Sequence, residues 1–135
     1  MSYAVSGALQ AAIYGALQGD ATLTGLVGSA IYDAPPSGTL PGLYVTLGAE
    51  RVRDASDGSN AGAWHDLTVA VVTGAAGFSA AKAVAGAVSD LLHEADLSLA
   101  RGRLVSLRFR RAEAKRERGG LRRIDMTFRA RVEDA

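Results

Sequence analysis

The sequence contains no cysteine, only three prolines and few aromatic residues, 6% of its 135 positions. Without cysteine it has no disulfide framework, no thiolate metal site and no cysteine nucleophile. No run approaches the ~20 apolar residues that span a bilayer, and the N-terminus lacks the positively charged start of a secretory signal. These absences predict a soluble intracellular protein with one domain, residues 1–135, that can bury a core without covalent or metal staples.

Residues with catalytic or metal-ligand chemistry do not gather along the chain. His65 and His93 have no second ligand at the spacing of a metal site, so we predict no metal role for either. We predict instead that His65 is a sheet-edge residue and that His93 lies near the end of a helix. Asp54 and Asp57 lack the ligand spacing and terminal glutamate of a calcium loop. The glycines of residues 74–77 precede a helix, but the Lys-Ser/Thr pair of a nucleotide loop is missing. We therefore predict no catalytic residue, no metal, no cofactor and no enzyme activity.

Charge is distributed unevenly, although the net charge is only +1. Residues 1–100 hold three basic and nine acidic side chains, whereas residues 101–135 hold twelve basic and five acidic ones. Such an asymmetry is typical of a nucleic-acid contact or of head-to-tail assembly. A solvated, arginine-rich sheet surface is the simpler alternative. Thirteen arginines against two lysines also fit a GC-rich coding bias, so part of the excess has a genomic explanation.

Hydrophobic periodicity predicts two amphipathic helices, over residues 3–18 and 78–95, and a short turn over 21–26 that Asp20 caps. Alternation predicts strands, of which the last two are the most regular. The predicted strands are residues 30–32, 43–47, 64–74, 103–113 and 121–133. This order predicts an α+β fold, a two-layer domain with a mainly antiparallel (mixed) sheet of four to five strands covered by two helices.

The last two strands form a long C-terminal β-hairpin around a turn at residues 116–120. Its arms, ~33 Å long, span a body whose radius of gyration is only ~14 Å. Monomeric proteins usually protect a long edge strand from pairing with other molecules. Either exposed arginines protect this one, or the edge strand pairs with another copy of the chain. We expect one apolar face of the hairpin to meet the helices. That face comprises Val105, Leu107, Phe109, Ile124, Met126 and Phe128.

Residues 51–63 are rich in glycine, serine and aspartate and have almost nothing to bury. We predict a mobile loop that becomes ordered against a neighbouring subunit or partner. Charged residues of this loop and of the hairpin are our candidates for a protein interface. They are Arg51, Arg53, Asp54, Asp57, Arg108, Arg110, Arg116, Arg118, Arg129 and Arg131.

Several short phrases, taken in order, resemble one family. They are the segment Asp20–Gly28 after the first helix, Ala30–Asp33, Pro41–Gly48, Leu91–Ala95 at the end of the second helix, and the arginine-rich final strand. The series is similar to the small tail-completion, or tail-terminator, proteins of long-tailed phages. Its alanine- and arginine-rich style most resembles the versions encoded in the gene transfer agents of alphaproteobacteria.

The resemblance implies a structural protein that forms a hexameric ring. Such a ring caps the tail tube, ends its polymerisation and gives the docking surface for the head connector. The implied partners are further copies of the chain, the tail tube protein and a head-side stopper or connector protein, with DNA only in passage through the lumen and no membrane. The implied location is the host cytoplasm during assembly and then the tail of a phage-like particle.

Two alternatives stay open at this point. One is a head-side adaptor or stopper ring subunit of the same kind of particle, which makes similar demands on a small chain. The other is a small arginine-rich nucleic-acid-binding domain. Against the second, Phe109 and Phe128 lie on the predicted apolar face, so the basic region lacks aromatic platforms on which bases could stack.

Overall fold

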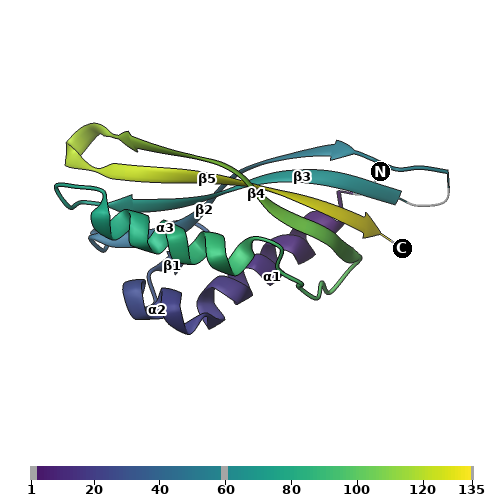
Figure 1. Cartoon of the computed structure of the whole chain (residues 1–135), viewed down its shortest axis with the longest axis horizontal. Helices are drawn as coiled ribbons and strands as arrows, with labels where there is room; N and C mark the ends of the chain where they lie inside the picture. The colour runs from purple at the N-terminus through teal and green to yellow at the C-terminus, as the bar shows by residue number, and fades with distance from the viewer. Residues whose placement is uncertain (1–2, 59–60, 135) are drawn as a thin grey trace.

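Three helices cover one face of a five-stranded sheet in the computed structural model, which describes residues 3–58 and 61–134 (Figure 1). The sheet order is β1-β2-β3-β5-β4, and only the β1–β2 pair is parallel. The elements are α1 (Val5–Gly19), α2 (Ala21–Val27), β1 (Ile31–Tyr32), β2 (Leu43–Asp54), β3 (Ala61–Thr73), α3 (Ser79–Leu92), β4 (Arg103–Arg116), the 3₁₀ turn Arg118–Gly120 and β5 (Arg122–Asp134). The predicted α+β fold with a mixed sheet and a long terminal hairpin is confirmed.

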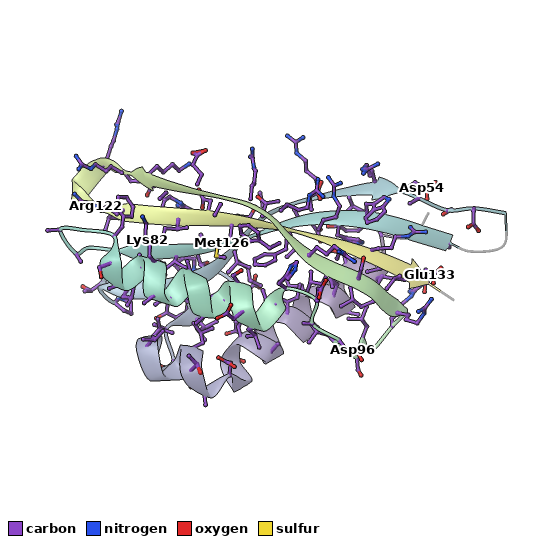
Figure 2. The ribbon with its side chains drawn as sticks, in the orientation of Figure 1. Asp54, Lys82, Asp96, Arg122, Met126 and Glu133 are labelled. Atoms are coloured by element: carbon purple, nitrogen blue, oxygen red, sulfur yellow. The ribbon has the colours of Figure 1, made fainter. Side chains whose placement is uncertain are left out.

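The core lies between the helices and the inner face of the sheet. Helix α1 buries one side chain per turn, and α3 does the same with smaller residues. Their stripes pack on β3 and β5, the two central strands, and Figure 2 shows Met126 pointing from β5 toward the helical layer. The main members are Leu9, Ile13, Leu17, Val84, Val88, Leu92, Val69, Val71, Ile124, Met126 and Phe128.

The predicted turn at residues 21–26 is a short helix, α2. Asp20 is its N-cap, and its carboxylate accepts a hydrogen bond from the Leu23 backbone N–H at 2.9 Å. This bond satisfies one of the N–H groups that the first turn of a helix leaves without a partner. The capping role predicted for Asp20 is therefore confirmed.

Two β-bulges in β4 change the predicted apolar face of the hairpin. Leu104 and Ser106 pair with the consecutive residues Val132 and Arg131, so Val105 is an extra residue that turns outward and is 46% exposed. The prediction that Val105 faces the helices is wrong because a bulge reverses the alternation beyond it. Phe109 packs edge-on against Phe128 but stays 36% exposed on the outermost strand. Of the six predicted residues, the other four are buried: Leu107, Ile124, Met126 and Phe128.

The loop predicted over residues 51–63 is shorter than expected. Strand β2 continues to Asp54 and β3 begins at Ala61, with Arg53 paired with Trp64. Cross-strand pairing outweighs the low β-propensity of this segment. Residues 59 and 60 lie outside the described residues, and the described part of the connection is 55–58. The mobility of this connection stays a prediction.

Gly102, just before β4, has no room for a side chain, because a backbone carbonyl lies where the Cβ would be. Its φ is +73°, and an added Cβ would lie 2.6 Å from the Glu133 carbonyl oxygen. We expect Gly102→Ala to lower the free energy of unfolding by about 2 kcal/mol in a denaturant titration, of which about 1 kcal/mol comes from the left-handed backbone. Gly119→Ala is the matched control, because its φ is +77° with nothing within 4 Å. Equal losses in the two variants would mean that the close approach has no energetic consequence.

Candidate functional site

The face of the sheet turned away from the helices, called the outer face below, carries most of the basic side chains of the protein. Figure 2 shows long nitrogen-bearing side chains rising from this face. The helical layer and its loops hold the opposite sign, with five acidic residues and two bases, Lys82 and Arg101. Those acids are Asp20, Asp33, Asp90, Glu94 and Asp96. The charge asymmetry along the chain is therefore a difference between the two layers of the fold.

Ion pairs tie several of the outer-face arginines to neighbouring strands. Arg129 of β5 holds Asp66 of β3 in a two-pronged contact, with Nε–Oδ1 at 2.8 Å and Nη2–Oδ2 at 3.3 Å. Its guanidinium keeps the pKa of the Asp66 carboxyl below its ordinary value, mainly through this hydrogen bond. On the same face, Asp125 accepts contacts from Arg123 at 2.9 Å and from Lys115 at 3.3 Å. Because these pairs remain partly open to solvent, each is worth about 1 kcal/mol or less and mainly orders the side chains.

Trp64, the single tryptophan, lies on the outer face beneath three guanidinium groups. Arg53, Arg129 and Arg131 have their Cζ atoms 5.5–5.9 Å from the ring centre. Arg131 also donates a hydrogen bond to the Ala55 carbonyl at 3.0 Å, which ties β5 to the β2–β3 connection. These distances fall within the range of cation–π interactions, which hold the arginines close to the ring. The indole is therefore covered and is no open stacking platform for a base.

The ten interface candidates fall into separate places rather than one patch. Arg51, Arg110 and Arg129 line one hollow of about 460 Å³ on the outer face. The others divide between the ring of Trp64, the β2–β3 connection, the α3 end and the hairpin tip. Arg53 and Arg131 lie over Trp64, Asp54 and Asp57 lie at the β2–β3 connection, Arg108 contacts Glu94 at 3.7 Å, and Arg116 and Arg118 lie at the tip.

A buried polar cluster that the sequence did not reveal lies between α1 and the sheet. His65 of the central strand β3 is 0% exposed, so the prediction of a sheet-edge residue is wrong. Its Nδ1 lies 3.1 Å from Glu50 Oε2, and Glu50 also accepts hydrogen bonds from the Ser6 and Tyr3 hydroxyls. The Nε2 atom of His65 is buried and has no hydrogen-bond partner among the residues that the structure describes. The only signal in the sequence is that His65 is in phase with the apolar residues of its strand.

The first half of the β4 edge is covered by the end of α3. The Phe109 backbone N–H donates to His93 Nδ1 at 3.0 Å, and the Glu94 N–H donates to the Leu107 carbonyl at 2.7 Å. His93 is the C-cap residue of α3, as predicted for a helix end. The backbone groups of an edge strand bind readily to another strand. Within residues 3–58 and 61–134, no hydrogen bond of this kind covers Arg111–Arg116, next to the hairpin tip.

The described residues offer no centre for metal chemistry. Within 3–58 and 61–134, no three His, Cys, Asp or Glu side chains come together as a set of ligands. In the same part of the chain, no helix combines the length and the apolar character that crossing a membrane would require. The features that remain are charged surfaces and strand edges, which are the means by which proteins contact one another.

Comparisons with known proteins agree with this description. Residues 11–133 match the family described as "Tail completion protein gp17". A chain in a solved structure described as the virion of a native gene transfer agent (GTA) particle is 61% identical. The two chains superpose with a TM-score of 0.93 over 98% of this chain and 99% of that chain. No curated protein matched.

The family match, the identity and the shared fold define a structural tail protein. More narrowly, the chain belongs to the tail completion protein gp17 family and is of the gene transfer agent type. The resemblance inferred from the short sequence phrases is thereby confirmed.

Proposed function

We propose that the protein forms a ring of six copies that closes the end of the tail tube, stops its growth and gives the head connector its docking surface. The observation that carries the proposal is the 61% identity to a chain from a gene transfer agent virion over nearly the full length of both chains. In this proposal the ring assembles in the host cytoplasm and is finally located in the tail of the particle. Its partners are the tube protein, a head-side connector protein and, in passage only, DNA.

The geometry supports a head-to-tail ring, because such a ring needs two different surfaces on each copy. The sheet offers two different edges. At one side β4 is open over Arg111–Arg116, and at the other β1 covers only Val45 and Thr46 of β2. The basic outer face and the acidic helical layer add a second pair of unlike surfaces. Edge pairing and apolar burial supply the affinity of the contact, and charge sets its register.

Charge at the hairpin tip can be tested without disturbing the fold. Arg116 and Arg118 lie at the tip and are exposed, so the double variant Arg116→Glu/Arg118→Glu should fold normally. Each exposed contact is worth under about 1 kcal/mol, but a ring repeats the loss at every interface. We expect the variant to give overgrown tails, or tails without heads, in electron micrographs of assembled particles. Lys82→Glu, a charge reversal on the helical layer, is the control for a change of sign away from the hairpin.

The outcomes separate the proposal from its alternatives. Tails of normal length joined to heads would contradict a role of the tip in the ring. Normal tails on particles that lose their DNA would indicate a head-side stopper instead. The mass of the wild-type protein in solution, measured at rising concentration, gives the number of copies. A protein that stays monomeric at every concentration and also on isolated tube ends would contradict the ring.

A further inference from the structure

Two β-bulges lie at the same level of the sheet, one on each side of its central strands. In β2, Gly48 and Ala49 stand between the paired residues Leu47 and Glu50 and face the single residue Thr68. In β4, Arg110 is the extra residue between Phe109 and Arg111, and Arg111 pairs with Thr127. Thr68 and Thr127 pair directly with each other. Bulges re-aim side chains, and they often occur beside functional sites.

The bulges build a hollow with a floor of small side chains. An unbroken strand would turn Arg110 and Arg111 to opposite faces, whereas the bulge turns both to the outer face. The pairing of Gly48 is so close that an added Cβ would lie 3.2 Å from the Thr68 Cβ. We call this hollow the threonine trough. Its floor is Ala49, Thr68 and Thr127, and its walls include Arg51, Arg110, Arg111 and Arg129.

The threonine trough crosses the sheet from β2 to β4. Its volume is about 460 Å³, and a second hollow of about 320 Å³ adjoins it. The two share Ala49, Thr68, Arg111 and Thr127, so together they form one continuous groove. The floor includes two partly buried threonines between walls of arginine. A groove of this kind fits an extended chain rather than a bulky group.

The trough contains more basic side chains than the ion pairs of the fold engage. Asp66 is engaged by Arg129, and Asp125 by Arg123 and Lys115. Arg51, Arg110 and Arg111 make no ion pair with any acid in residues 3–58 or 61–134, although Arg110 is close enough to lower the pKa of Asp66. Guanidinium groups bind carboxylates in strong, often two-pronged hydrogen bonds. Three such groups around a threonine floor form a receptor for carboxylates.

We propose that the threonine trough binds an extended acidic segment of another protein, whose carboxylates lie between Arg51 on one wall and Arg110 and Arg111 on the other. The carboxylates of Asp66, Glu113 and Asp125 interrupt the positive lining. A lining of alternating sign suits separate carboxylates, whereas the even phosphate charge of duplex DNA binds best to an unbroken basic surface. The site goes beyond the ring proposal, and the isolated protein suffices to test it.

The single tryptophan provides the readout for a binding experiment. Trp64 precedes Asp66 on the same face and lies beneath Arg129, a wall of the trough, at 5.9 Å. We expect its fluorescence to change when a short peptide of alternating glutamate and threonine is added. A peptide of alternating glutamine and threonine should produce no change at the same concentration. Added salt should weaken the binding, because the trough and the contacts are exposed.

Two variants locate the binding site. Arg110→Gln/Arg111→Gln should weaken binding of the glutamate peptide by about tenfold or more, since it removes two charge-assisted contacts. Arg116→Gln/Arg118→Gln removes the same charge at the hairpin tip and should leave the affinity unchanged. Thr127→Gln, which keeps the charge and fills the floor, should also weaken binding. Unfolding midpoints equal to wild type show that each variant is folded.

Every other outcome overturns the proposal. Equal weakening in the trough and tip variants would indicate general charge attraction without a site. Tighter binding of a double-stranded DNA oligonucleotide, lost in the trough variant, would indicate a nucleic-acid surface. Self-association of the wild type that the trough variant abolishes would mean that the occupant is a second copy of the chain. None of these results depends on whether the tip variants disturb tail length, so the ring proposal fails or stands separately.

Discussion

Phe128→Ala is expected to lower the free energy of unfolding by about 3–5 kcal/mol, the usual loss when a buried phenylalanine is truncated. Phe128 is 0% exposed on the central strand β5, and its ring packs against Phe109 with the centroids 5.8 Å apart. Removing it takes away the apolar contacts and leaves a cavity between the sheet and the helices. A denaturant titration followed by circular dichroism measures the loss.

Phe109→Ala is the matched control, because the two rings touch and differ mainly in burial. Phe109 is 36% exposed on the outermost strand, so its truncation leaves an open surface and no closed cavity. We expect a loss of about 1 kcal/mol for this variant. If Phe128→Ala costs less than Phe109→Ala, the inner face of β5 has been assigned to the wrong side of the sheet.

Glu50→Ala is expected to lower the free energy of unfolding by about 2–3 kcal/mol, a larger loss than for an exposed acidic residue. It removes the carboxylate that lies 3.1 Å from His65 Nδ1 and that accepts hydrogen bonds from Ser6. The imidazole of His65 would then be fully buried with neither nitrogen bonded. The loss stays below the 3–5 kcal/mol of a fully buried pair, because the Glu50 side chain is 23% exposed.

Two further variants show whether the hydrogen bonds or the burial of Glu50 matter. Glu50→Gln keeps a side-chain oxygen for the Ser6 hydroxyl, so its stability should fall between wild type and Glu50→Ala. Glu113→Ala removes a carboxylate that is 66% exposed on the edge strand, and its effect should stay within about 0.5 kcal/mol. A loss for Glu50→Ala no larger than that for Glu113→Ala would show that the buried cluster does not stabilise the fold.

Local patterns predicted the elements well where one residue type repeats along one face. The alternation from Ile124 to Val132 gave the inner face of β5 correctly, because β5 contains no extra residue and pairs with β3 without a register shift. The same alternation failed in β4 at Val105, where the strand inserts an extra residue. An inserted residue has no local signature, since its position depends on what the neighbouring strand presents. The edge strand tolerates it because only one of its sides must pair.

The charged site shows the same division. Arg51, Arg110 and Arg129 were each recognised as interface candidates, but nothing in the sequence placed them in one hollow. They come from three different strands, and their convergence requires the sheet order, the register and both bulges. Thr68 and Thr127, the floor of that hollow, carry no signal of their own. A threonine in a strand is ordinary, and its role depends on the residues across the sheet.

The sequence by itself determined the helices, the strands, the α+β fold and the region of the chain, residues 101–135, in which positive charge collects. These follow from periodicity and composition, which act over a few neighbouring residues. Only the tertiary structure decided that His65 is buried against Glu50, that Arg110 and Arg111 share one face, and that the open part of the β4 edge begins at Arg111. Those properties depend on contacts between residues far apart in the chain, and such contacts form only once the sheet has closed and the helices have packed upon it.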